Sequence, residues 1–173
     1  SRITDLTRIP DQLGGLIQNQ EPYSYLSELY HNKSHFLYLG RGITYPVALE
    51  GALKLKEISY IHAEGSPAGE MKHGPIALID ERMHVVAIAP QDNLQDKMAN
   101  NISEVKTRGG TVIAIATEGD TYNPSLVDHT LYIPKTSFLL TPIVASVPLQ
   151  LLAYHLAVRL GRDVDQPRNL AKT

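Results

Sequence analysis

The sequence predicts an α/β protein, a three-layer α/β/α sandwich around a mostly parallel, doubly wound sheet. Two observations carry this prediction. Short runs rich in Val, Ile and Ala, at residues 85–89 and 111–116, are almost wholly apolar, which is typical of strands buried on both faces. These runs alternate with longer segments of helical periodicity, and that alternation indicates parallel strands joined by helices, as in flavodoxin-like and Rossmann-like sheets.

The elements of the first half are predicted from periodicity and from turn residues. Two amphipathic helices are expected within residues 9–31, the second opened by Pro22. A strand at residues 36–39 ends at the glycines of a Gly-Arg-Gly turn, residues 40–42, and leads into a long helix over residues 44–60. A small extra strand is expected at residues 61–64.

The second half repeats the strand and helix pattern. The strand at residues 85–89 precedes a helix over residues 92–108, which Gly109 and Gly110 close at its C-terminal end. The strand at 111–116 follows, and residues 131–133 form a short fourth strand. The last helix runs to about residue 160, with Thr141 as its expected cap and Pro142 in its first turn.

The length fits one domain, since the chain has 173 residues, of which 43% are hydrophobic. No internal repeat or low-complexity tract divides it. We therefore predict a single domain over residues 1–173, with a helical arm over 1–33 and a tail over 162–173. Because the chain begins with Ser1 rather than Met, we expect a fragment of a longer protein.

Composition narrows the classes of partner and chemistry. Sixteen basic against eighteen acidic residues give a net charge of −2, so no bulk field attracts nucleic acid or an anionic membrane. The most apolar stretch, residues 139–160, is interrupted by prolines and polar residues and is not expected to span a membrane. The absence of cysteine excludes disulfides, thiolate nucleophiles and Cys-based metal sites, and favours a cytoplasmic location.

A charged stripe on the helix over residues 44–60 is the first candidate for chemistry. At about 100° per residue, Glu50, Lys54 and Glu57 share one face, and apolar residues border that face. This pattern suggests a buried helix that faces a cleft. Two interpretations stay open: helix ion pairs worth about 0.2 to 0.5 kcal/mol each, or a general base beside a cation, as proton abstraction next to a carbonyl requires.

The other candidates are ambiguous on the residues alone. Residues 40–42 lack the third glycine of a dinucleotide fingerprint and are more typical of a turn that lets the backbone approach a ligand or another subunit. The loop at residues 64–75 carries His73, which either functions chemically or terminates a short helix. The tail, with Arg168 and Lys172, has the composition of fraying chain.

We predict no metal site. The candidate ligands are His62, Glu64, Glu70 and His73. These residues lack the helical spacing of a metal motif such as HExxH.

Several motifs together resemble one family. FLYLGRG at residues 36–42, the segment 45–64, GEMKHGP at 69–75, VPLQLLAYH at 147–155 and DVDQPRNLAK at 163–172 resemble the second sugar-isomerase (SIS) domain of glutamine-fructose-6-phosphate aminotransferases, also called glucosamine-6-phosphate synthases. The resemblance covers most of residues 35–173. The tail motif is specific to this family rather than to sugar-isomerase domains in general.

The resemblance implies an enzyme that makes glucosamine 6-phosphate from fructose 6-phosphate and glutamine-derived ammonia, without a cofactor. The implied partners are the sugar phosphate, the first SIS domain and the glutaminase domain of the same enzyme, and a second copy in a homodimer. The implied roles fall on six residues: Glu57 as the base that moves a proton between sugar carbons, Lys54 beside it, Glu50 orienting Lys54, His73 assisting ring opening in a neighbouring subunit's site, Lys172 bonding with or polarising the sugar carbonyl, and Arg168 holding the tail. The stripe, the His73 loop and the tail are thus expected to meet in one pocket.

Two features of the family have no counterpart here. The chain has no cysteine to serve as a glutaminase nucleophile, and no Ser/Thr-rich loop to grip a sugar phosphate, for which residues 117–121 are a poor substitute. We therefore expect the C-terminal half of an isomerase region, nearly inactive alone. A phosphosugar-binding regulatory module and a standalone sugar-phosphate isomerase or deaminase remain as alternatives; the stripe and tail disfavour the first, and the missing phosphate loop disfavours the second.

Overall fold

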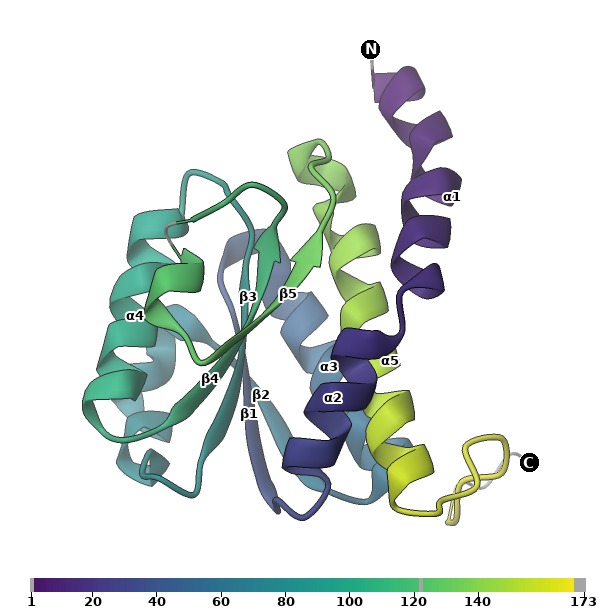
Figure 1. Ribbon diagram of the computed structural model, residues 1–173. Coiled ribbons are helices and arrows are strands. Elements are labelled where there is room, and N and C mark those ends of the chain that lie inside the picture. The colour runs from purple at the N-terminus through teal and green to yellow at the C-terminus, as the bar shows by residue number, and fades with distance from the viewer. Residues whose placement is uncertain (1, 122, 170–173) are drawn as a thin grey trace.

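The computed structural model describes residues 2–121 and 123–169, which form one parallel sheet with helices on both of its faces (Figure 1). All strand pairs are parallel, in the order β2-β1-β3-β4-β5. The strands are β1 (His35–Gly40), β2 (His62–Pro67), β3 (His84–Ala89), β4 (Thr111–Thr117) and β5 (His129–Ile133). This order is that of flavodoxin-like sheets, so the predicted fold class is confirmed.

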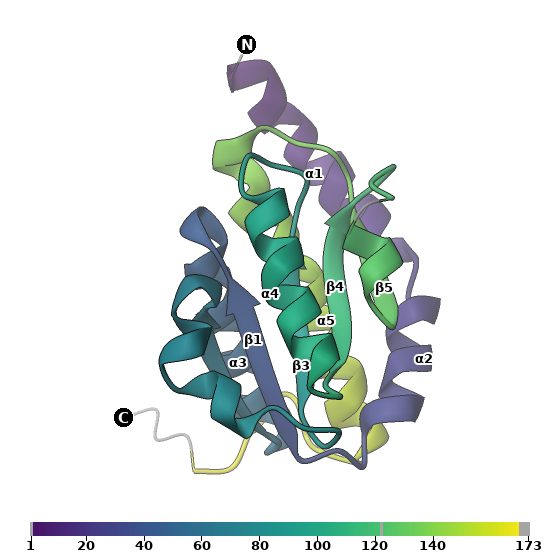
Figure 2. The same ribbon diagram turned by 90° about the vertical axis from the view of Figure 1, so that its left-hand side faces the viewer.

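Two layers of helices enclose the sheet (Figure 2). The helices are α1 (Arg2–Gln18), α2 (Glu21–Tyr30), α3 (Tyr45–Ser59), α4 (Gln95–Thr107) and α5 (Thr141–Arg159). The cores place α1, α2, α3 and α5 on one face of the sheet. The other face packs against α4 and the short turn η2 (Ala68–His73), followed by η3 (Pro75–Leu78).

Strand β1 shows how the apolar runs supply both cores. Phe36 and Tyr38 pack into the core beneath α3 and α5, while Leu37 and Leu39 pack into the core beneath α4. Successive side chains of a strand point to opposite faces, so a continuous apolar run is needed where both faces are covered. The interpretation of such runs as central strands is therefore confirmed.

Helix α3 packs closely on β1 and α5 because a glycine faces both of them. A Cβ atom at Gly51 would lie 2.8 Å from Cε1 of Tyr38 and 2.6 Å from Cδ1 of Leu149. Ala52 and Leu55 complete the buried side of α3. The helix is thereby fixed in rotation about its axis, which determines where its charged stripe points.

Several boundaries differ from the predictions, among them the following three. Helix α1 begins at Arg2 instead of residue 9 and passes through Pro10, and its first turns extend beyond the rest of the domain (Figure 1). Strand β2 is longer than predicted and pairs with β1 along six residues. Thr141 is the first residue of α5 and not its cap, because the turn at Phe138–Leu140 leads directly into the helix and Leu140 occupies the cap position.

Helix α5 is the central helix of the larger core. The segment Phe138–Arg159 is long and apolar enough to cross a bilayer by length and composition alone, yet half of its most apolar window is buried inside the protein. A core helix of a folded domain has the same properties. Its apolar character is accounted for by contacts with the sheet, α2 and α3.

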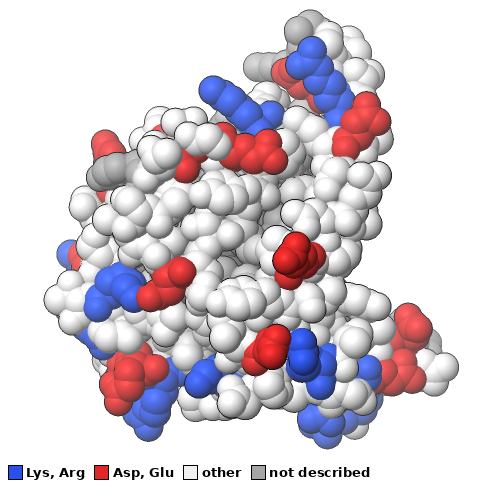
Figure 3. Space-filling view, viewed as in Figure 1, with Lys and Arg blue, Asp and Glu red and all other residues white. Residues whose placement is uncertain are grey.

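The face shown in Figure 3 carries both signs of charge. Blue and red side chains alternate around its edges, and its centre is largely uncharged. The small net charge of −2 is therefore not gathered into a single-sign patch on this face. Such a surface exerts no strong long-range field.

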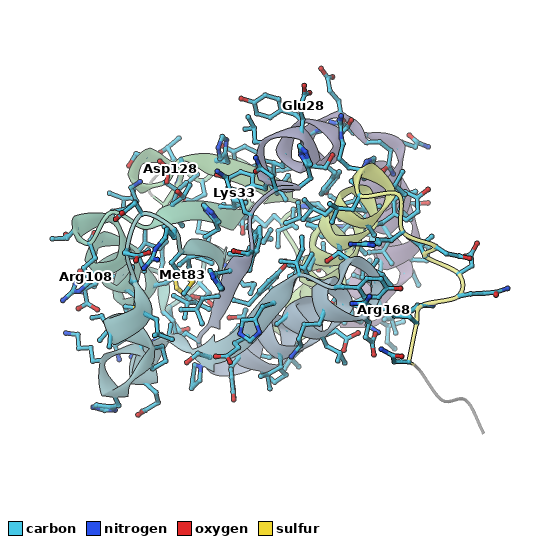
Figure 4. The ribbon with its side chains drawn as sticks, turned by 90° about the horizontal axis from the view of Figure 1, so that it is seen from below. Glu28, Lys33, Met83, Arg108, Asp128 and Arg168 are labelled. Carbon is cyan, nitrogen blue, oxygen red and sulfur yellow. The ribbon has the colours of Figure 1, made fainter. Side chains whose placement is uncertain are left out.

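The buried His84 makes the stability of the fold depend on pH. Its side chain is 5% exposed, and its ring lies 5.2 Å from that of Tyr30 and 5.5 Å from that of Phe36. Burial, with Lys33 and His35 nearby, lowers the pKa of His84 from 6.5 to about 4. Figure 4 shows Lys33 at this end of the sheet. Because the unfolded chain takes up a proton near pH 6.5, this stabilisation is complete above that pH and is lost as the pH falls towards 4.

We expect the free energy of unfolding to be lower at pH 4.5 than at pH 7.5, with His84 contributing about 1 to 3 kcal/mol, since one pKa unit corresponds to about 1.4 kcal/mol. His84→Phe, which fills the same aromatic site without titrating, should remove that part of the difference. Urea denaturation of both chains at both pH values measures it. An unchanged pH difference in the variant would contradict the assignment.

Candidate active site

The charged stripe of α3 forms a connected ion-pair network. The Lys54 ammonium donates a hydrogen bond to Glu57, with 2.8 Å between Nζ and Oε2, and lies 3.6 Å from Oε1 of Glu50. The hydrogen bond to Glu57 raises the pKa of Lys54, against the effect of partial burial. The three side chains are 43%, 33% and 27% exposed from Glu50 to Glu57. Lys54 is thus a permanent cation between two carboxylates.

The stripe faces outward in this chain, so the expectation of a buried helix that faces a cleft is wrong for the described residues. Ala48, Ala52 and Leu55 are buried, but Leu49 and Leu53 beside the stripe are 43% and 41% exposed. The reason is that β1, β2 and α5 cover only one side of α3. A half-exposed apolar border around a charged network is therefore left uncovered by the rest of the described chain.

The C-terminal tail returns to the end of the same helix. Beyond α5, the backbone N–H of Arg168 donates to the Tyr60 hydroxyl at 3.0 Å, and its guanidinium lies 4.1 Å from the centre of the Tyr60 ring. Figure 4 shows Arg168 on the tail beside α3. Together these groups border an open hollow of about 400 Å³, which we call the tail hollow; its lining residues are Lys56, Glu57, Tyr60, Ile61, His62, Arg168 and Asn169.

His73 lies in the other layer of the protein. It is the last residue of η2, which packs with α4 on the opposite face of the sheet from α3. Its Nδ1 lies 2.6 Å from Oε2 of Glu70, and its side chain is 74% exposed. Lys72 beside it pairs with Glu104 of α4 at 2.7 Å. His73 therefore both terminates a short helix and presents its ring outward.

The structure brings together some of the predicted site residues and separates others. Glu57 and Arg168 border the tail hollow, and ion pairs connect Lys54 to Glu57 and Glu50 to Lys54. His73 does not reach this hollow within the described chain, so the expectation of one shared pocket fails inside a single copy. Lys172 lies outside the described residues, and its role stays a prediction.

The acidic and histidine side chains considered for a metal fall into two separate pairs. His62 lies 3.4 Å from Glu64, and His73 pairs with Glu70. Across residues 2–121 and 123–169, no group of three or more such side chains comes together.

The Gly-Arg-Gly turn serves the chain itself. A Cβ atom at Gly40 would meet the backbone of Thr44 and Tyr45, and the Arg41 backbone N–H donates to the Thr44 hydroxyl at 2.9 Å. The interpretation as a tight turn is confirmed, and at Gly40 the backbone that approaches is the start of α3; the approach of a ligand or another subunit stays a prediction. The contact with the start of α3 explains the glycine at residue 40, and the positive φ of 57° explains the one at residue 42.

Tyr60 and Asn169 were not predicted from the sequence. Both have positive φ, at 65° and 61°, and they are the two such non-glycine residues in the part of the chain that the structure describes. Both line the tail hollow. For Tyr60, the sequence signal that could have been used is the absence of a glycine. The predicted helix ends at residue 60, and glycine usually takes the left-handed position after a helix.

Comparison with known proteins gives the same family for sequence and fold. A family model described as SIS domain matches residues 28–160. The chain is 56% identical over 173 residues to a glutamine-fructose-6-phosphate aminotransferase (isomerizing) of Thermus thermophilus, and 54% identical over 171 residues to that of Bacteroides thetaiotaomicron. It spans 29% and 28% of the length of these relatives.

Solved structures agree with this. The C-terminal domain of glucosamine-fructose-6-phosphate aminotransferase from Francisella tularensis matches with a TM-score of 0.87 and 42% identity, covering 94% of this chain and 46% of that one. A glucosamine-6-phosphate deaminase from Thermotoga maritima matches with a TM-score of 0.71 at 24% identity, which supports the fold alone. This match covers 48% of the deaminase chain, so both matches span just under half of the solved chain.

Proposed function

This chain belongs to the SIS-domain family, and on that premise we propose that it is the C-terminal sugar-isomerase domain of an enzyme that converts fructose 6-phosphate and ammonia to glucosamine 6-phosphate. The observation that carries the proposal is the Glu50, Lys54 and Glu57 network on α3, with the tail folded back onto the end of that helix. The 56% identity to the glutamine-fructose-6-phosphate aminotransferase (isomerizing) of Thermus thermophilus supports the proposal.

Proton transfer between adjacent carbons of the sugar needs a carboxylate base and a nearby cation. In our proposal Glu57 is the base, because its carboxylate ends the stripe and borders the tail hollow. Lys54 balances the negative charge that develops on the substrate, and Glu50 holds Lys54 in place from one helical turn away. Lys172 polarises or bonds with the sugar carbonyl when the tail covers the site. This proton transfer requires no cofactor.

His73 acts in a different site in this proposal. Its ring is exposed in the α4 layer, where it pairs with Glu70 and is separated by the sheet from the stripe of its own chain. We therefore propose that it assists ring opening in the site of a neighbouring copy. The homodimer and the cytoplasmic location belong to the same proposal.

The chain supplies only part of a site. It spans 29% of its Thermus relative, and its Leu49 and Leu53 leave an apolar border around the stripe uncovered. We propose that a first sugar-isomerase domain covers this border and grips the sugar phosphate, and that a glutaminase domain supplies the ammonia. A half-exposed charged stripe in this chain is what such an arrangement requires.

We expect the isolated 173-residue chain to form no measurable glucosamine 6-phosphate from fructose 6-phosphate and ammonium. Half a site also binds the substrate poorly, so fructose 6-phosphate should leave its melting temperature unchanged, whereas it should raise that of the full natural chain containing this sequence. Differential scanning fluorimetry and an amino-sugar assay on both chains test this, with unphosphorylated fructose as the control ligand. Turnover by the isolated chain would contradict the division of the site.

A further inference from the structure

A polar hollow borders α4 and the turn η2, in the layer of the protein opposite to the charged stripe. It has a volume of about 600 Å³, and we call it the α4 hollow; its lining residues are Arg41, Gly69, Lys72, Lys97, Asn100, Asn101 and Glu104. Three basic residues and one acidic residue give this lining a charge of +2, although the whole chain has a net charge of −2. The α4 hollow therefore gathers positive charge in a chain that has no excess of it.

One face of α4 makes the lining an elongated surface. Lys97, Asn101 and Glu104 follow one another at intervals of four and three residues, so they lie on the same side of the helix. At a rise of about 1.5 Å per residue, Lys97 and Glu104 are about 10.5 Å apart along the helix axis. The hollow can therefore contact an extended ligand at several levels.

Arg41 is held at the middle level of this surface. Its Nη1 donates to Oδ1 of Asn101 at 3.1 Å, and because Asn101 is 7% exposed, a buried amide holds the guanidinium in place. On the η2 side, a Cβ atom at Gly69 would lie 3.3 Å from the same Nη1, so the guanidinium packs closely there as well. Among the described residues, this is the one hydrogen bond that the guanidinium makes, and a guanidinium has several further N–H donors.

Lys72 and Lys97 occupy the two ends of the surface. The Lys72 ammonium lies 2.7 Å from Oε1 of Glu104, so these two charges balance each other. The side chain of Lys97 is exposed and makes no hydrogen bond or ion pair with another described residue. The partner of Arg41 is an uncharged amide. Within residues 2–121 and 123–169, the charges of Arg41 and Lys97 therefore have no counter-charge.

We propose that the α4 hollow binds a diphosphate group, with Arg41 and Lys97 donating to its two phosphates. A guanidinium binds phosphate oxygens through paired N–H donors, and an ammonium binds them as a point charge. Lys97 and the residue that holds Arg41 are about 6 Å apart along the helix axis, and two linked phosphates bridge this separation better than a single phosphate does. The site is separate from the stripe, and the proposal does not rest on the proposed function.

The lining favours a small anion over a segment of another protein. Protein interfaces gain most of their binding energy from aromatic and other large side chains that fill desolvated pockets. Apart from one glycine, the residues that line the α4 hollow are all polar or charged, so such a side chain finds no apolar contact there. A diphosphate instead offers several negative charges and acceptor oxygens in a small volume, which is what two uncompensated cations require.

Calorimetric titration of the full natural chain with inorganic pyrophosphate tests the site. Saturating fructose 6-phosphate keeps the proposed sugar-phosphate site occupied, and the buffer contains no divalent cation, because such a cation would bind pyrophosphate. Lys97→Gln removes one charge at an exposed position, so the fold stays intact. Arg41→Lys keeps the charge and loses the paired donors. Lys33→Gln is the matched control: Lys33 precedes β1 and Arg41 follows it, so they lie at opposite ends of the strand (Figure 4).

We expect one pyrophosphate to bind per chain, with its affinity lowered about fivefold by Lys97→Gln and about tenfold by Arg41→Lys. The control should match the wild type. Inorganic phosphate should bind at least about tenfold more weakly than pyrophosphate, and a tenfold increase in NaCl should weaken pyrophosphate binding, because salt screens exposed charges. ADP distinguishes two sources of the diphosphate group: binding of ADP that is equally sensitive to Lys97→Gln supports a nucleoside diphosphate, and binding of pyrophosphate without ADP supports the free anion.

The proposal is overturned if pyrophosphate does not bind, if both variants bind it as tightly as the wild type, or if single phosphate binds equally well. It is also overturned if pyrophosphate does not bind while Lys97→Gln changes the oligomeric state in light scattering, because a second copy of the chain then covers the hollow. These outcomes do not depend on whether the chain forms glucosamine 6-phosphate. The activity of the wild type and of Glu57→Gln tests the proposed function separately.

Discussion

If Glu57 is the base of the proposed reaction, we expect Glu57→Gln to lower kcat for glucosamine 6-phosphate formation by the full natural chain about a thousandfold. General-base catalysis contributes between a hundredfold and ten-thousandfold, and an amide cannot accept the proton. Gln has nearly the same shape as Glu, and its carbonyl oxygen can still accept the Lys54 hydrogen bond, which is 2.8 Å long in the native network. The folded structure and KM should therefore change little.

Two measurements separate the role of Glu57 from other steps. Product formation gives kcat, and incorporation of solvent deuterium into the sugar phosphate, followed by NMR, reports proton abstraction directly. Both should fall together in Glu57→Gln. Glu28→Gln, an exposed carboxylate of α2 at the opposite side of the domain (Figure 4), is the matched control and should retain full activity. Unchanged deuterium exchange in Glu57→Gln would show that another group is the base.

The layers and strands of this fold were predictable because local pattern and burial coincide. A run such as residues 85–89, apolar at every position, cannot form an exposed strand, and it is β3 at the centre of the sheet. Boundaries were less predictable where backbone contacts decide them. The turn before α5 moved the cap from Thr141 to Leu140, and no side-chain preference signals that.

The site was predictable only where it lies on one helix. Helical spacing places Glu50, Lys54 and Glu57 in one network, and the structure confirms that network. The position of His73 depends on which face of the sheet receives the segment after β2, and periodicity does not encode that choice. The contact between Arg168 and Tyr60 joins residues 108 positions apart and depends on a rare backbone conformation. Residue spacing therefore carried no information about it.

Gly40→Ala should destabilise the domain by about 3 to 5 kcal/mol, a large part of the roughly 5 to 15 kcal/mol typical of a folded domain. The added Cβ would clash with the carbonyl of Thr44, whose carbon lies 2.5 Å away, and would lie 2.7 Å from Cα of Tyr45. All of these are backbone atoms, so no side chain can rotate to make room. The strand end and the helix start would have to separate.

The surrounding bonds oppose that separation. The Thr44 hydroxyl accepts from the Arg41 N–H at 2.9 Å and donates to the Arg41 carbonyl at 3.0 Å, and Thr44 is 1% exposed. Moving Thr44 would break both hydrogen bonds inside the buried turn and shift the start of α3. Gly14→Ala is the matched control: Gly14 lies within α1 with no atom within 4 Å of an added Cβ, so the substitution should stabilise by about 0.5 to 1 kcal/mol. Urea denaturation of the three chains measures both effects, and a Gly40→Ala chain as stable as the wild type would mean that the backbone of this turn can yield.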